Sequence, residues 1–131
     1  SSTIIVDDEG ERLIVAYSDP GMPADANWLT PRLERGVVLA DLSWPQGAIA
    51  VLGAARDAGL PRVLDADRYR HDRALVDHVI TLASHVIFSG PGLRQFTGQE
   101  SVASGLAAIE GDFALIGVTD GSEGFFWRDG T

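Results

Sequence analysis

The sequence lacks cysteine and lysine altogether across its 131 residues. The absence of cysteine excludes disulfides, thiolate catalysis and cysteine-ligated metal centres at once. Because all ten cationic side chains are arginines, any positive group that binds a phosphate here must be a guanidinium, which presents a planar bidentate fork. No apolar run approaches the roughly 20 residues of a membrane-spanning helix, and no segment resembles a signal peptide. We therefore expect a cytoplasmic protein that has no membrane partner.

Positive charge is scarce overall. The chain has ten basic and 19 acidic residues, which gives a formal net charge of -9. A nucleic-acid or anionic-membrane surface needs clustered positive charge, so this balance argues against both kinds of partner. Hydrophobic residues make up 45% of the chain, which is enough for one compact unit with a real core.

Short apolar runs alternate with segments of helical periodicity along most of the chain. The pattern predicts strands at 36–42, 62–66, 85–88 and 113–118, and helices at 24–33, 46–58, 74–83 and 102–109. The run at 36–42 is typical of a strand covered on both faces, and the helix at 46–58 is expected to stop at Gly59, ahead of Pro61. Such alternation predicts an α/β fold with right-handed βαβ units and a parallel sheet. Ahead of it, residues 3–6 and 12–17 are predicted to form a β-hairpin.

Polar side chains follow the predicted strands at the ends where parallel sheets bind ligands. They are Asp41, Asp65, Asp67, Ser89 and Thr119. Two carboxylates at one strand end, Asp65 and Asp67, could orient a magnesium-bound water or an arginine, or they could cap the next turn. An aspartyl-phosphate motif is disfavoured, because Arg68 and Tyr69 follow where that motif expects small or β-branched residues.

The loop at residues 119–124 carries the most informative functional signal. An apolar run delivers the Thr119 hydroxyl and two glycines into a tight connection, and residues 125–127 return as a second strand. A hydroxyl beside glycine amides suits a polyphosphate, because amides without a neighbouring Cβ can approach phosphate oxygens closely. The same composition also occurs in ordinary turns, so both interpretations stay open for the loop alone.

Histidines do not form a metal-binding pattern. His71, His78 and His85 recur every seven residues, a step of about 10 Å on a helix, which is too long for two imidazoles to share one ion. We therefore predict no resident metal site.

Several blocks occur in a characteristic order. They are Val6-Asp-Asp-Glu-Gly-Glu-Arg12, Val37-Val-Leu-Ala-Asp41 with Ser43-Trp-Pro45, Ala54-Ala-Arg-Asp-Ala-Gly-Leu-Pro61 with Val63-Leu-Asp-Ala-Asp67, His85-Val-Ile-Phe-Ser89, Phe96-Thr-Gly98 and Val118-Thr-Asp-Gly121. This succession resembles the middle of a PfkB (ribokinase-like) carbohydrate kinase. The resemblance implies a ribokinase-like three-layer α/β/α core with parallel strands, preceded by part of a β lid.

The resemblance also implies a division of the chain. Residues 1–18 would belong to the lid, and residues 19–131 to a partial α/β nucleotide-binding core that is continuous with it. In the family, the lid closes over the sugar and excludes water, and it often pairs with a second subunit. A homodimer through the lid is therefore expected.

The implied activity is ATP-dependent phosphorylation of a sugar or sugar derivative, with Mg2+ accompanying the nucleotide. In the family a Thr-x-Gly-x-x-Gly loop lines the ATP phosphates, which assigns Thr119, Gly121 and Gly124 to the nucleotide, together with Ser89. Asp67 and Asp65 stand where many relatives have Asp-x-Asn, and would lie on the phosphate or substrate side.

Two departures from the family pattern qualify the resemblance. Ser89-Gly-Pro-Gly92 stands where many relatives have Asn-x-x-Glu, which leaves magnesium placement open and favours a subgroup nearer ketohexokinase and sulfofructose kinase. The signature Asp-Thr-x-Gly-Ala-Gly-Asp, whose last Asp is the catalytic base, is absent. We therefore assign no catalytic residue and expect a central fragment of a longer protein. A noncatalytic nucleotide- or sugar-binding module and an α/β scaffold domain are the alternatives.

Overall fold

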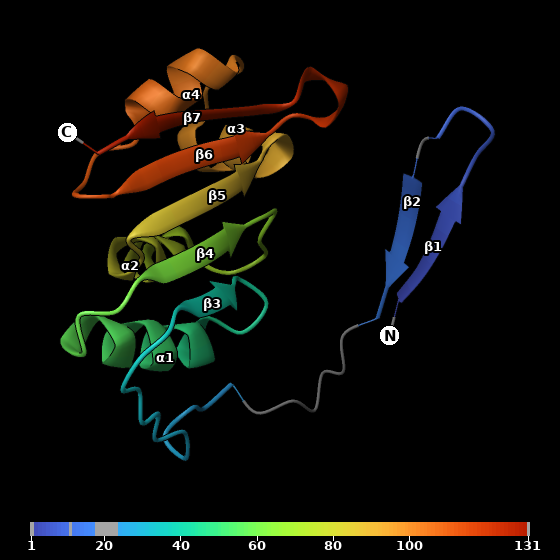
Figure 1. The fold of residues 1–131 in the computed structure, drawn as a ribbon. Helices are drawn as coiled ribbons and strands as arrows, with labels where there is room; N and C mark the ends of the chain where they lie inside the picture. Colours follow the sequence, from blue (N-terminus) through green and yellow to red (C-terminus); the bar gives the residue numbers. More distant parts are fainter. Residues whose placement is uncertain (1, 11, 18–23, 131) are drawn as a thin grey trace.

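The computed structural model describes residues 2–10, 12–17 and 24–130 (Figure 1). A two-stranded sheet consists of β1 (Ser2–Val6) and β2 (Arg12–Ala16). A five-stranded sheet consists of β3 (Val38–Asp41), β4 (Arg62–Ala66), β5 (His85–Ser89), β6 (Leu115–Thr119) and β7 (Phe125–Asp129). The helices are α1 (Pro45–Asp57), α2 (Arg73–Leu82), α3 (Gly90–Thr97) and α4 (Val102–Ala108), with a short 3-10 turn, η1, at Gly121–Glu123. In the part of the chain that the structure describes, none of these helices is long and apolar enough to span a bilayer.

The strands of the large sheet follow one another in sequence order, β3-β4-β5-β6-β7. The first four run parallel, and β7 returns antiparallel to β6. The predicted α/β alternation is therefore confirmed. The carboxyl ends of β3 to β6 share one edge of the sheet, which we call the carboxyl edge. Register there sets Asp41 opposite Asp65 and Ser89 opposite Thr119.

Helix α1 ends as the sequence predicts. Gly59 adopts a left-handed conformation with φ of 68°, which a residue without Cβ reaches at little cost. Its N–H donates to the carbonyl of Arg56 at 3.0 Å, and the N–H of Leu60 donates to the carbonyl of Ala55 at 2.8 Å. These bonds satisfy carbonyls that the helix end would otherwise leave unpaired.

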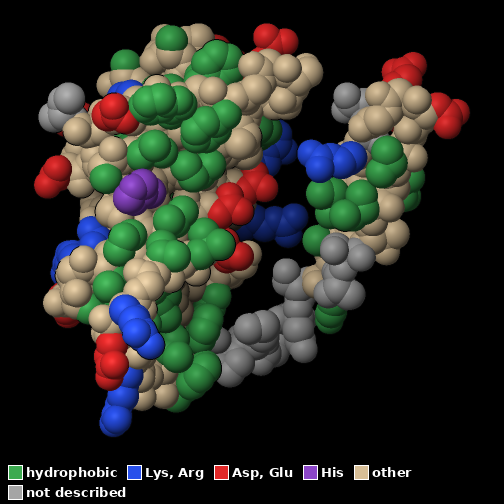
Figure 2. Space-filling view, viewed as in Figure 1, with side chains coloured by type: hydrophobic (Ala, Val, Ile, Leu, Met, Phe, Trp, Pro, Cys, Tyr) green, Lys and Arg blue, Asp and Glu red, His purple; other side chains and the backbone are tan. Residues whose placement is uncertain are grey.

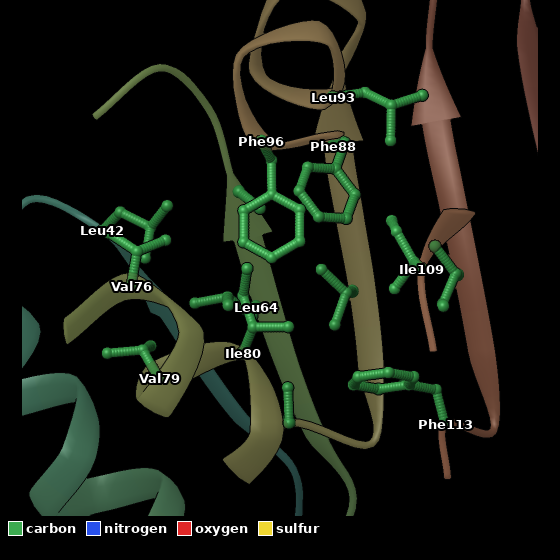
Figure 3. Close-up of a cluster of buried hydrophobic side chains, with 14 of the residues drawn as sticks. Leu42, Leu64, Val76, Val79, Ile80, Phe88, Leu93, Phe96, Ile109 and Phe113 are labelled. Atoms are coloured by element: carbon green, nitrogen blue, oxygen red, sulfur yellow. The ribbon is translucent and has the colours of Figure 1, made fainter. Parts of the chain in front are cut away.

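The helices of the described chain lie against one face of the large sheet (Figure 1), and the core forms between them (Figure 3). Alternate strand side chains enter this core, so Leu64, Val86 and Ile116 are fully buried and Phe88 is 2% exposed. Their neighbours in sequence point to the opposite face, where Leu39 is 70% exposed. Burial on one face alone follows from the two-residue period of a strand.

The expectation that the strand at 36–42 is covered on both faces is wrong. Strand β3 lies at the edge of the sheet, and its residues alternate between half-buried and exposed. An apolar run records which side chains are hydrophobic, but it does not reveal whether a second layer covers them.

The helix predicted at 24–33 is also wrong. The segment contains a turn, in which the Asp25 carboxylate accepts the backbone N–H two residues further on at 2.9 Å. Such side-chain bonds compete with helical ones, and Pro31 brings no N–H of its own. Trp28 stacks on Trp44 with ring centroids 5.8 Å apart, which fastens the segment to the start of α1.

Helix α3 does not appear among the predicted elements, because Gly90-Pro-Gly92 is typical of a turn. In the structure the Ser89 Oγ accepts the Gly92 N–H at 3.0 Å and caps the helix. Proline fits the first helical turn, which needs no N–H from it. Gly98, with φ of 70°, ends the helix.

The β1–β2 hairpin forms a separate small sheet beyond the carboxyl edge (Figure 1). Its strands pair antiparallel, with Ile4 opposite Ile14. The hairpin exposes apolar side chains on both faces, each 54% to 60% exposed: Ile4, Ile5, Val6, Leu13, Ile14 and Val15.

Candidate functional site

Two adjoining cavities open at the carboxyl edge. The first, of about 730 Å³, lies between this edge and the end of β2, and Asp41 is among its lining residues. The second, of about 480 Å³, is lined by Ser89 and Thr119 together with apolar strand residues. Asp65 and Asp67 line both cavities. The structure thus brings together the five polar residues that the sequence sets at the strand ends.

Asp67 connects the ends of β4 and β5. Its Oδ1 accepts the Ser89 hydroxyl at 2.6 Å and the backbone N–H of Arg68 at 2.7 Å. Because the same Ser89 oxygen accepts the Gly92 N–H, the hydroxyl is already engaged on both sides. Ser89 therefore serves as a helix cap and as the partner of Asp67 in this structure, which is a structural role that its sequence position does not reveal.

Three carboxylates share the carboxyl edge, and none of them pairs with a cation of residues 2–10, 12–17 or 24–130. Although Asp65 remains exposed, partial desolvation raises the pKa of its carboxyl above the ordinary value, and the charges of Asp67 and Asp41 raise it further. The Asp41 carboxylate accepts the Ser43 N–H at 2.8 Å, which holds it at the turn after β3. Beside these three carboxylates, electrostatic repulsion disfavours a further negative charge, and attraction favours the binding of a cation.

Asp65→Asn is expected to stabilise the protein at pH 7 and not below about pH 4. A carboxyl whose pKa is raised by folding contributes stability when protonated, and that contribution is lost as the pH rises through the folded-state value. Removing the charge should raise the midpoint of thermal unfolding by about 1 to 3 °C at pH 7, a small effect because the group is solvated. Thermal unfolding at both pH values tests this. Asp112→Asn, at an exposed site away from the edge, is the control. A gain that is equal at both pH values would contradict the expectation.

The loop after β6 has a defined backbone. Within it, the N–H of Asp120 donates to the Gly124 carbonyl at 2.9 Å, and the N–H of Glu123 donates to the Asp120 carbonyl at 3.0 Å. Gly121 and Gly124 both have positive φ, at 54° and 101°, which favours glycine at each position. The described chain offers no backbone acceptor to the N–H groups of Gly121 and Ser122. Thr119 lines the second cavity, whereas the two glycines lie further along the loop.

The segment that follows Asp67 is anchored to α3. The N–H of Tyr69 donates to the Gln95 side-chain oxygen at 3.2 Å, and the Gln95 amide donates back to the Tyr69 carbonyl at 2.9 Å. The Tyr69 ring is half-buried against the core. Nothing in the sequence indicates this pair, because its members are 26 residues apart.

The described residues contain no group of three or more histidine or acidic side chains that could hold a metal ion. Asp65 and Asp67 still offer carboxylate oxygens beside both cavities. Oxygen donors of this kind suit an Mg2+ ion that takes most of its ligands from phosphates and water. The donor set therefore fits a metal that arrives with a nucleotide.

A scan against models of known protein families gives no match. Among solved structures, the chain is similar to a candidate ribokinase from Agrobacterium tumefaciens, with 32% identity and a TM-score of 0.72 over 98% of this chain and 42% of that protein. It is similar in fold to a fructokinase from Vibrio cholerae O395 with fructose, ADP and calcium bound, at 21% identity and a TM-score of 0.71, over 98% of this chain and 48% of that one. It is also similar in fold to a nucleoside kinase from Burkholderia thailandensis in complex with inosine, at 15% identity and a TM-score of 0.67, over 98% of this chain and 42% of that one. The chain spans less than half the length of each of these three proteins.

Proposed function

Because the chain belongs to the ribokinase-like (PfkB) family of carbohydrate kinases, we propose that the whole protein transfers the γ-phosphoryl group of ATP to a hydroxyl of a sugar or sugar derivative. The observation that carries this proposal is the meeting of two cavities at Asp65 and Asp67, with Thr119 in one of them. Phosphoryl transfer needs aligned substrates and neutralised charge more than it needs covalent chemistry from the protein. A shared wall between a nucleotide cavity and an acceptor cavity suits that requirement.

The nucleotide phosphates are assigned to the second cavity and the loop beyond it. There the Thr119 hydroxyl and the free N–H groups of Gly121 and Ser122 would donate to phosphate oxygens. Gly124 would permit the close return of the backbone. Ser89 would act by holding Asp67 in place, since its hydroxyl already donates to that carboxylate.

Mg2+ is assigned to the nucleotide rather than to a resident site. The related fructokinase is described with ADP and calcium bound, which supports a nucleotide accompanied by a divalent cation. Asp65 and Asp67 would orient water in the ion's outer sphere. The ion would neutralise phosphate charge beside carboxylates that otherwise repel it.

The remaining assignments concern regions of the chain. Residues 1–18 would form part of a lid over the acceptor cavity, and 19–131 part of the core. Residues Ala16 and Tyr17 line the first cavity, and the hairpin's apolar faces would suit pairing with a second copy. We assign the protein to the cytoplasm, where ATP is supplied, and we assign no residue of this chain as the catalytic base.

Thr119→Ala is expected to weaken ATP binding about tenfold, the usual loss when one hydrogen bond to a charged group is removed. Thr119→Ser keeps the hydroxyl and is expected to bind within about twofold of the native protein. Calorimetric titration with Mg2+ and ATP, on protein expressed from the complete reading frame, measures both. Unchanged affinity in a folded Thr119→Ala variant would contradict the assignment of this loop.

The kinase proposal is tested by ADP formation from ATP in the presence of candidate sugars. Sugar-dependent ADP formation is the expected result. Saturable ATP binding without ADP formation would instead favour a binding module, and no saturable heat would favour a scaffold.

A further inference from the structure

The first cavity has a basic wall that the proposed transfer reaction does not use. Arg68 and Arg70 line it, with Tyr69 between them. Figure 2 shows basic and acidic side chains together in the space between the sheet and the hairpin. Across the described part of the chain, the single ion pair joins Arg73 and Asp77 on α2, so neither of the two cavity guanidiniums is neutralised by a carboxylate.

The lack of pairing has a structural reason. Asp67 is adjacent to Arg68 in sequence, but its Oδ1 binds the Ser89 hydroxyl and the Arg68 backbone N–H instead of a guanidinium. The mutual hydrogen bonds between Tyr69 and Gln95 then hold the following backbone against α3. The two arginines therefore extend from an anchored segment, which lowers the entropy lost when they bind a ligand.

The cavity as a whole is bipolar. Three carboxylates line its wall at the carboxyl edge, and two arginines line its adjoining wall. A neutral sugar would pair its hydroxyls with the carboxylates and leave both guanidiniums without a partner. A sugar that also carries an anionic group would satisfy both walls, because phosphate, sulfonate and carboxylate match the guanidinium fork.

We propose that the acceptor is a sugar bearing an anionic group, and that Arg68 and Arg70 bind that group while the accepting hydroxyl lies toward Asp65 and Asp67. The proposal rests on the kinase function proposed above and names its substrate class. The nucleotide phosphates are a separate ligand, because the cavity that holds Thr119 contains neither arginine. Because the protein has a net charge of -9, most of its surface repels anions, and an anionic ligand should bind preferentially at this local basic site.

The test compares fructose, fructose 6-phosphate and gluconate as acceptors, using protein from the complete reading frame. The native protein is expected to show a KM for at least one of the two anionic acceptors that is about tenfold or more below that for fructose. The double variant Arg68→Gln with Arg70→Gln should raise that KM about 10-fold to 100-fold, while the KM values for ATP and fructose stay within about twofold. The matched control, Arg35→Gln with Arg56→Gln, removes two exposed charges that line neither cavity and should change none of these values.

The possible outcomes separate the two proposals. Equal use of fructose and the anionic acceptors would overturn the anionic-substrate inference and leave the kinase function standing. A rise in the KM for ATP in the double variant would overturn it too, since the arginines would then bind the nucleotide. If no acceptor yields ADP, the proposed kinase function is wrong. The anionic-ligand inference is then tested by measuring the binding of fructose 6-phosphate and fructose by calorimetry. Tighter binding of fructose 6-phosphate than fructose, lost in the double variant, would support it, and equal or absent binding of both would overturn it.

Discussion

Gly92→Ala is expected to destabilise the protein by about 1 to 3 kcal/mol, the usual range for forcing extra atoms into a packed site. A Cβ at this position would lie 2.5 Å from the Ala66 carbonyl oxygen and 3.1 Å from the Asp67 carbonyl carbon. Both are backbone atoms, so α3 must move away from the end of β4. The better helix propensity of alanine, up to about 1 kcal/mol, does not offset this clash.

The displacement should also disrupt the site. The Gly92 N–H donates to the Ser89 Oγ, and this hydrogen bond holds the Ser89 hydroxyl where it donates to the Asp67 carboxylate. For the kinase function that we propose, phosphoryl transfer by the whole protein should fall about 100-fold, since a misplacement of about 1 Å can have that effect on aligned reactants. Thermal unfolding and steady-state ADP formation measure the two effects.

Gly53→Ala is the matched control for this prediction. It makes the same substitution within α1, where a Cβ would have no atom within 4 Å. It should stabilise the protein by as much as about 1 kcal/mol and leave activity unchanged. If Gly92→Ala behaved like Gly53→Ala, the close approach of α3 to β4 would be disproved.

Phe88→Ala is expected to lower the free energy of unfolding by about 3 to 5 kcal/mol, which corresponds to a midpoint roughly 12 to 20 °C lower. The side chain is 2% exposed at the centre of the core, and its ring lies 5.5 Å from that of Phe96 (Figure 3). Truncation removes buried apolar area and leaves a cavity that the neighbouring strands cannot close. Chemical denaturation with urea measures the loss directly.

Phe126→Ala on β7 is the corresponding control, because that ring is 42% exposed. It should cost only about 1 kcal/mol, in proportion to the smaller area that it buries. A loss below about 1 kcal/mol for Phe88→Ala would mean that the core does not pack around this residue as the structure describes.

The α/β alternation could be predicted because its signals are local. Gly59 and Pro61 end α1 through the φ that glycine permits and the N–H that proline lacks, and both properties belong to single residues. Helix α3 was not predicted, because Gly90-Pro-Gly92 has the composition of a turn. The structure shows that a helix begins there, capped by the hydrogen bond from the Gly92 N–H to the Ser89 Oγ. The prediction of a helix at 24–33 was wrong for the opposite reason, because side-chain contacts removed a helix that the local composition favours. The helical composition of this segment is overridden by the Asp25 turn and by the stacking of Trp28 on Trp44.

The candidate site divides in the same way. Asp41, Asp65, Asp67, Ser89 and Thr119 could be found from the sequence, because each follows an apolar run and parallel strands end at one edge. Their functional assignments remain predictions. The sequence did not indicate that the Ser89 hydroxyl is engaged by Asp67, or that Tyr69 is held by Gln95, because both bonds join residues more than 20 positions apart.

By itself, the sequence determined the alternation of strands and helices outside α3 and residues 24–33, the identity of the edge residues and the absence of cysteine and lysine chemistry. These follow from side-chain period and composition, which are properties of neighbouring residues. Only the tertiary structure decided that the described helices cover one face of the sheet, that Gly92 must approach Ala66 closely, and that Arg68 and Arg70 line a cavity without a carboxylate partner among the described residues. Those outcomes depend on which distant segments pack together, and packing between distant segments leaves no periodic signal in a single sequence.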